Sequence, residues 1–196
     1  CRREIAGLTG VADPARVVVP SLRAYRLAQR LGPGRELSLS TSTVGHLYGV
    51  DNFDELALQF GGRALALAED EGSPWHEAVA RSRMAMVHYY RGRWDDSLAL
   101  LDEARALFLR TGDLFELGSC YTHIYANRLN QGRYRLAADA ARAMSDVVAR
   151  TGQKQFLARG ARGQLLYARG KLGELDTPAA IAALRQAANE ARDARD

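Results

Sequence analysis

Histidines, cysteines and an adjacent pair of carboxylates are the residues of this 196-residue chain that could support metal binding or catalysis. The histidines are separated by at least a dozen residues, and they are His46, His76, His88 and His123. A lone histidine on a helix is more often a hydrogen-bonded packing residue than a ligand. Cys1 and Cys120 form no ligand cluster, and we expect Cys120 to pack as a small apolar residue.

The motifs that usually identify an enzyme are missing from the sequence. It contains no Gly-x-x-x-x-Gly-Lys-Ser/Thr phosphate loop, and no His-Glu-x-x-His, Gly-x-Ser-x-Gly or Cys-x-x-Cys. The glycines at 32–34 are typical of a turn between helices. Asp95 and Asp96 fit the first turn of a helix, where they complement its dipole. We therefore predict no metal site, no cofactor and no catalytic activity.

The composition is that of a folded protein, with 47% hydrophobic and 26% charged residues. The net charge is +4, from 27 basic and 23 acidic residues, and only Lys154 and Lys171 among the basic residues are lysines. The arginines are scattered among acids, so genomic coding bias explains them better than nucleic-acid binding. Arg23, Arg26 and Arg30 share one helix face and are the best residues for the nucleic-acid alternative.

Three further features concern the cellular location of the chain and its place in a longer protein. No stretch approaches the roughly 18 to 20 apolar residues of a membrane span. The low cysteine content favours a reducing, cytoplasmic compartment. The chain begins with Cys1 rather than Met and ends on Ala-Arg-Asp-Ala-Arg-Asp, so we expect a segment of a longer protein.

A period of forty residues runs through the sequence. Glycines recur at this spacing at positions 32, 72, 112 and 152, and the Arg-Thr-Gly of 110–112 recurs at 150–152. A second site, Arg-Gly-Arg-Trp at 91–94, returns as Gln-Gly-Arg-Tyr at 131–134. Two turns in each period predict two elements in each repeat.

Those elements are predicted to be helices. Between residues 94 and 110, Leu98, Leu101, Ala104 and Phe108 follow the helical i, i+3, i+4 pattern. The same reasoning predicts helices over 13–31, 35–49, 53–70, 75–91, 94–110, 114–131, 134–150, 154–169 and 178–194. Residues 1–9 would be the truncated first helix of the leading unit, and 171–176 would be a small insertion. The fold class is all-α, and the helix pairs form one domain, 1–196, with units at about 1–32, 35–72, 75–112, 114–152 and 154–195.

This pattern resembles tetratricopeptide (TPR) repeats. The matching residues are Ala85, Gly92, Trp94 and Ala104 in one unit and Gly132, Tyr134 and Ala137 in the next. The alanines permit close helix contact, the glycines allow a tight turn, and the aromatic residues wedge between helices. The resemblance implies a right-handed α-solenoid of about 9 to 10 helices. The period is longer than the usual 34 residues.

Forty-residue units that end in phrases such as Phe-Leu-Arg-Thr-Gly-Asp (108–113) are similar to the helical repeats of large bacterial ATP-binding signalling and transcriptional regulators. The high arginine content would suit a high-GC bacterium. This resemblance implies a non-catalytic protein-protein interaction or scaffold module of a signalling protein. The alternative is an effector- or peptide-sensing domain of a transcriptional regulator.

The resemblance also implies where partners bind, because the first helix of each pair lines the concave face of such a solenoid. Aromatic, arginine, hydroxyl and amide groups on those helices suit peptide recognition. The predicted partner-binding residues are Tyr48, Arg83, Tyr90, Thr122, His123 and Asn130. The alternative for Tyr89 and Tyr90 is that they fill space between repeats. Expected partners are a protein or peptide segment, sibling domains of the parent chain, or a second copy in a homodimer. No binding to a membrane is expected.

Overall fold

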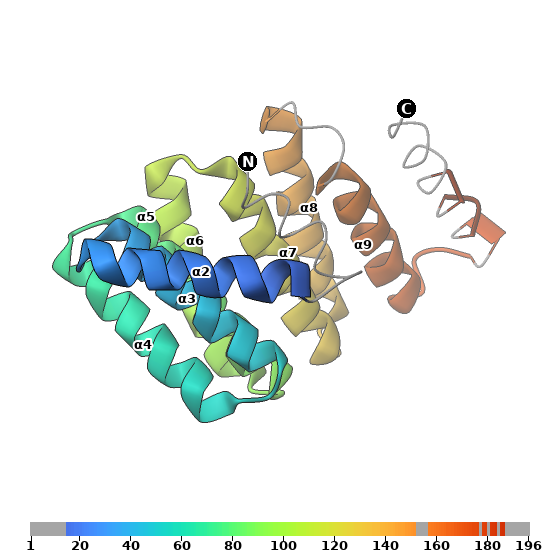
Figure 1. Cartoon of the computed structure of the whole chain (residues 1–196). Coiled ribbons are helices and arrows are strands. Elements are labelled where there is room, and N and C mark those ends of the chain that lie inside the picture. The colour runs from blue at the N-terminus through green and yellow to red at the C-terminus, as the bar shows by residue number, and fades with distance from the viewer. Residues whose placement is uncertain (1–14, 152–156, 177, 180, 184, 187–196) are drawn as a thin grey trace. The chain divides into compact units, whose positions relative to one another are not determined.

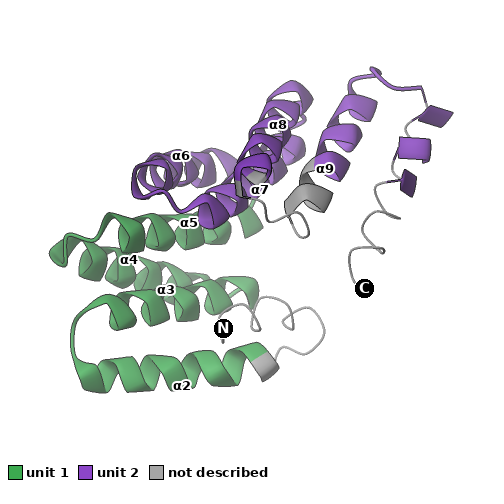
Figure 2. Ribbon diagram, turned by 90° about the horizontal axis from the view of Figure 1, so that it is seen from above, with its two compact units in different colours: residues 1–93 green, residues 94–196 purple. Residues whose placement is uncertain are grey.

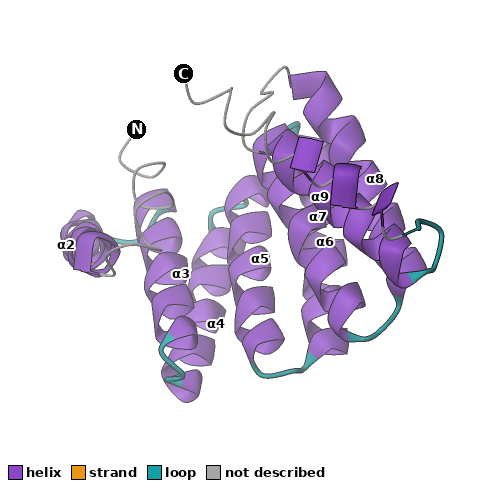
Figure 3. Ribbon diagram, turned by 90° about the vertical axis from the view of Figure 1, so that its right-hand side faces the viewer, coloured by secondary structure: helices purple, strands orange, loops and turns teal. Residues whose placement is uncertain are grey.

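Helices make up all the regular structure in the part of the chain that the structure describes. The computed structural model describes residues 15–151, 157–176, 178–179, 181–183 and 185–186 (Figure 1). Over these ranges it contains helices joined by short loops and no strand (Figure 3). The predicted helix over residues 1–9 lies outside the described residues, as does most of the one over 178–194. The all-α fold class is confirmed.

The chain forms two compact units, residues 1–93 and 94–196 (Figure 2). Unit 1 contains α2 (Ala15–Leu31), α3 (Arg35–Val50), α4 (Asp54–Asp70) and α5 (Pro74–Tyr90). Unit 2 contains α6 (Trp94–Thr111), α7 (Leu114–Asn130), α8 (Tyr134–Thr151) and α9 (Leu157–Lys171). These bounds agree with the predicted helices to within one turn. The boundary between the units falls inside the third predicted repeat, and the single domain stays a prediction.

Residues with positive φ at corresponding turn positions preserve the forty-residue period. The turn inside each helix pair carries Asn52 (φ 62°), Gly92 (φ 71°) or Gly132 (φ 71°). The turns between pairs carry Gly72 (φ 62°) and Gly112 (φ 74°). This left-handed region is favourable for glycine and tolerable for asparagine, whose short polar side chain can bond locally. The period seen in the sequence is therefore a period of backbone geometry.

Small side chains let α3 and α4 approach closely. Ala57, Gly61 and Ala64 of α4 are buried. A Cβ atom added at Gly45 of α3 would lie only 3.0 Å from the Cβ atom of Phe60. Larger residues would push the helices apart, so these positions set the spacing of the pair.

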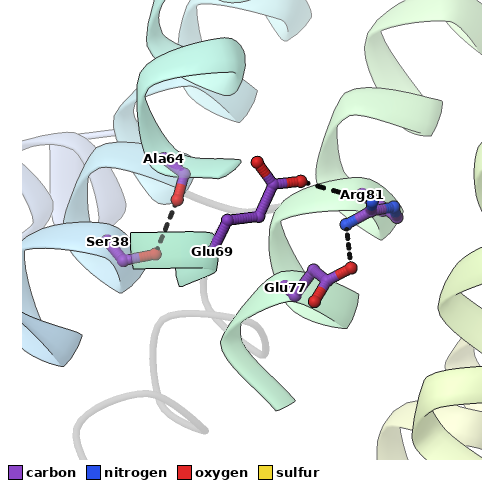
Figure 4. Close-up of polar contacts among 5 residues, drawn as sticks. All are labelled: Ser38, Ala64, Glu69, Glu77 and Arg81. Carbon is purple, nitrogen blue, oxygen red and sulfur yellow. Dashed lines mark hydrogen bonds and ion pairs between the residues drawn. The ribbon is translucent and has the colours of Figure 1, made fainter. Parts of the chain in front are cut away.

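Polar contacts fix the orientation of the unit 1 helices. The hydroxyl of Ser38 on α3 donates to the carbonyl oxygen of Ala64 on α4 at 2.8 Å (Figure 4). Arg81 on α5 pairs with Glu77 at 2.7 Å and with Glu69 of α4 at 3.5 Å. Partly exposed ion pairs contribute only about 0 to 1 kcal/mol each. These ion pairs therefore determine the orientation of the helices more than they raise the stability of the fold.

The core of unit 2 is built from its own helices. Leu101 and Phe108 of α6 are fully buried, and the thiol of Cys120 on α7 donates to the Leu101 carbonyl oxygen at 3.3 Å. Burial raises the pKa of Cys120 to about 12, so the thiol stays protonated and unreactive. Its predicted role as a small packing residue is confirmed. A second cluster involves α7, α8 and α9 and contains Tyr125, Ala137, Ala138, Ala140, Ala141 and Ala168.

The substitution Ala64→Leu should destabilise unit 1, because the added atoms have no space between α3 and α4. We expect a loss of roughly 1 to 3 kcal/mol, the usual cost of overpacking, measured by denaturant unfolding followed by circular dichroism. Ala66→Leu is the control, because Ala66 is exposed on the same helix. Equal stability of the two variants would show that close packing at Ala64 does not set the helix spacing.

Candidate partner-binding surface

The predicted binding residues all lie on the first helices of helix pairs. Three belong to unit 1, on α3 and α5, and three belong to unit 2, on α7. They are Tyr48, Arg83 and Tyr90 in unit 1, and Thr122, His123 and Asn130 in unit 2. The structure gives each of them a different environment.

Arg83 connects α5 to α3. Its Nη1 atom donates to the carbonyl oxygen of Leu39 at 2.9 Å and to the hydroxyl oxygen of Thr43 at 2.8 Å. The Ser42 hydroxyl oxygen accepts from the same nitrogen. Hydrogen bonds that involve a charged group contribute about 1.5 to 3 kcal/mol. Arg83 therefore helps to hold the two helices together, whatever it contributes to partner binding.

Tyr90 is a solvent-facing aromatic ring held by other rings. Its side chain is 44% exposed, and its ring centroid lies 6.1 Å from that of His46 on α3 and 5.7 Å from that of Tyr89. Burial, and then the neighbouring Tyr89, raises the pKa of Tyr90, so the phenol stays neutral. An aromatic ring that is held in place and half exposed is a typical anchor for a protein partner.

Arg83 and Tyr90 lie seven residues apart on α5, so they share one face of the helix. Both reach toward residues of α3. We name this region the α3–α5 surface, and it consists of Thr43, His46, Arg83 and Tyr90. The sequence predicts His46 to be a packing residue. It does not indicate the contact with Tyr90, because only the folded chain brings the two residues together.

A narrow recess lies between α3, α4 and α5, beside His46 and Arg83. His46, Arg83 and Met84 line it, and Ala57 and Gly61 of α4 also contribute. The recess is too narrow to hold even a water molecule. It therefore offers no enclosed volume for a small-molecule ligand.

Tyr48 lies against α4 and is not part of the α3–α5 surface. Its ring centroid lies 5.4 Å from that of Phe60 and 6.1 Å from that of Phe53. Phe53 is itself 56% exposed at the turn that leads into α4. Tyr48 thus belongs to an aromatic group between α3 and α4, which the sequence alone did not indicate.

The last residues of α3, α5 and α7 occupy equivalent positions at forty-residue spacing. They are Val50, Tyr90 and Asn130, and all three are exposed. They offer an aliphatic, an aromatic and an amide side chain. Two of the three were predicted from the sequence, and Val50 was missed because an exposed valine gives no chemical signal.

Thr122 is directed toward α8. Its hydroxyl donates to the carbonyl oxygen of Gly118 at 3.1 Å and contacts the Met144 sulfur at 2.8 Å. Met144 is fully buried. The hydroxyl of Thr122 is therefore already used in packing α7 against α8.

His123 is a neutral histidine. Burial lowers its pKa to about 4, and its Nδ1 atom has no hydrogen-bond partner among the described residues. The amide nitrogen of Asn127, one turn later, donates to the His123 carbonyl oxygen at 2.9 Å. Asn127 is fully buried, and sequence reasoning did not single it out.

No group of three or more metal-ligating side chains occurs in the described part of the chain. None of the described helices combines the length and the apolar character needed to cross a bilayer.

Comparison with known proteins bears on the fold. No protein-family model matches the chain, and no curated protein matches it. A solved structure described as a Podosopora anserina kinesin light chain with nearly identical TPR-like repeats is similar over 100% of this chain and 95% of its own. The TM-score is 0.68 and the sequence identity 13%. The chain has a TPR-like repeat fold. At this identity the likeness concerns the fold alone, and TPR-like folds generally serve as protein-protein interaction scaffolds.

Replacing Arg83 should destabilise unit 1. Arg83→Ala removes the hydrogen bonds to Leu39, Ser42 and Thr43, so we expect a loss of about 1 to 3 kcal/mol, seen as a lower melting temperature. Arg110→Ala, at an exposed arginine of α6, is the control and should leave the melting temperature nearly unchanged. Equal melting temperatures would contradict the connecting role of Arg83.

Acid should destabilise the fold through His123. The folded pKa of about 4 lies below the usual 6.5, so the unfolded chain binds a proton that the folded chain does not. The stability that the fold gains while His123 is neutral is complete above pH 6.5 and is lost progressively as the pH falls toward 4. Thermal unfolding across this range should show a smaller pH dependence in His123→Gln than in the parent. A His123 ring that titrates near pH 6.5 in NMR spectra would contradict this.

Proposed function

We propose that this chain is a non-catalytic protein-protein interaction module of a bacterial signalling or regulatory protein. The TPR-like fold supports this role, since such folds are typically interaction scaffolds. The buried, protonated thiol of Cys120 is unsuited to act as a nucleophile. The preference for arginine over lysine supports the bacterial setting, and the sparse cysteines are typical of the cytoplasm.

The observation that carries the proposal is the exposed residue at the end of the first helices α3, α5 and α7. Val50 and Tyr90 in unit 1 and Asn130 in unit 2 present different chemistry at the same repeat position. Tyr90 is the strongest anchor because His46 and Tyr89 already restrain its ring. A restrained ring loses little conformational entropy when a partner covers it.

The partner that fits best is a polypeptide segment. The recess beside His46 and Arg83 is too narrow for an enclosed effector, while the α3–α5 surface presents the ring of Tyr90 next to the imidazole of His46. These groups suit backbone amides and apolar side chains of a peptide. The segment can come from another protein or from a sibling domain of the parent chain.

Peptide selection tests the proposal. A library of displayed random peptides is selected on the 196-residue chain, and the affinities of independent binders are then measured by fluorescence anisotropy. We expect Tyr90→Ala to weaken most of them about tenfold or more, as hot-spot residues do. Leu109→Ala is the matched control, because Leu109 is an exposed apolar residue of α6 (51%) outside the proposed surface.

The control should change these affinities by less than about twofold. Binders that lose as much affinity with Leu109→Ala as with Tyr90→Ala, or that ignore both changes, would show that the α3–α5 surface is not the site.

A further inference from the structure

Helix α2 carries an apolar stripe that no other described part of the chain covers. The stripe, which we name the α2 stripe, consists of Pro20, Ala24, Leu27 and Leu31, spaced by four, three and four residues on one helix face. Leu27 is 60% exposed and Leu31 is 77% exposed, and Pro20 and Ala24 are exposed as well. A contiguous apolar stripe is stronger evidence of a contact surface than four scattered apolar residues would be.

The forty-residue period shows what normally covers these positions. Three of their equivalents, Phe60 and Ala64 of α4 and Glu71 directly after it, contact α3, the first helix of the same pair. Ala64, equivalent to Ala24, is fully buried, and its carbonyl oxygen accepts from Ser38 of α3 at 2.8 Å. Glu71, equivalent to Leu31, pairs with Arg35 of α3 at 3.1 Å.

Unit 2 repeats the arrangement. The equivalents of the first three stripe residues in α8 are Ala140, Met144 and Val147, and all are buried. The Met144 sulfur contacts the hydroxyl of Thr122 on α7, again the first helix of the same pair. In both units, therefore, the stripe on a second helix is the surface that a first helix covers.

The other side of α2 is already packed within unit 1. Ala28 is only 3% exposed, and the ring of Tyr25 contacts that of Phe60 on α4 edge-on at 5.6 Å. A helix that covers the α2 stripe would add to this packing without displacing it.

Arginines border the open edge of the α2 stripe. Arg23 and Arg30 lie four residues before and three residues after Leu27, so they are its neighbours on the helix surface. Arg26 is exposed beside them, and α2 contains no aspartate or glutamate. None of these three arginines forms an ion pair with any residue that the structure describes. The edge is therefore cationic, and no described acidic residue neutralises it.

We propose that the α2 stripe docks an amphipathic helix of another polypeptide, with alanine and leucine on its contact face and acidic residues facing Arg23 and Arg30. Symmetric pairing with α2 of a second copy would place like charges together. Residues 1–14, where the sequence predicts the truncated first helix of this pair, carry two arginines, one aspartate and one glutamate, and so bring no net negative charge to Arg23 and Arg30. Phosphates of a nucleic acid would neutralise the arginines but would leave Leu27 and Leu31 in water. The α2 stripe is a second surface, separate from the α3–α5 surface.

A pair of synthetic helical peptides tests the proposal on the 196-residue chain. The first is a labelled 18-mer with leucine and alanine on one face and glutamate on both edges, long enough to follow α2, which spans about 25 Å. Its twin has lysine at every glutamate position. We expect fluorescence anisotropy to show binding of the glutamate peptide at least about tenfold tighter than of the lysine peptide.

Three variants identify the surface. Leu27→Asp should weaken binding of the glutamate peptide about tenfold or more, and the double change Arg23→Glu with Arg30→Glu should reverse the preference between the peptides. Leu109→Asp, on α6, is the control and should leave binding unchanged. Circular dichroism confirms that each variant is folded.

Several results would overturn the proposal. These are absence of binding, equal binding of the two peptides, or insensitivity to Leu27→Asp. Light scattering gives a further test: a chain that self-associates and becomes monomeric with Leu27→Asp would assign the α2 stripe to a second copy. Binding of a duplex DNA oligonucleotide that needs the arginines but not Leu27 would assign the arginines to nucleic acid.

Discussion

The close approach of paired helices through small side chains is the constraint on which the rest of this structure depends. In the α3–α4 pair, Gly45 faces Phe60, and Ala64 is fully buried. At this separation, a serine such as Ser38 can reach a carbonyl oxygen of the neighbouring helix. Small residues thus determine both the helix spacing and which polar contacts are available.

Much of the polar chemistry suggested by the sequence is used inside the fold for that reason. Arg83 bonds to α3, and Thr122 contacts buried Met144 of α8. Both lie on first helices, as the repeat implies, but each side chain is directed toward a neighbouring helix. The side chains that remain available to a partner are those at the helix ends, such as Tyr90, and on uncovered faces, such as Leu27.

The helices and turns could be predicted from the sequence because their causes are local. Apolar periodicity gives the helices, and glycine marks the positive φ positions, except at Asn52, where asparagine takes the place that Gly92 and Gly132 hold later. The environments of the site residues could not be predicted in this way. Whether Tyr48 faces solvent or Phe60 depends on how closely another helix approaches, which no nearby residue specifies.

The exposed residues at the ends of α3, α5 and α7 also affect how such a chain can evolve. Exposed positions away from the core usually tolerate substitution with little change in stability. In repeat proteins, stability is approximately a sum of terms from each repeat and its neighbours, so a change in one repeat leaves the others nearly unaffected. Val50, Tyr90 and Asn130 can therefore be exchanged one at a time between descendants of this sequence. Where these residues bind a partner, as proposed, recognition can diverge rapidly while the scaffold that displays it is inherited unchanged.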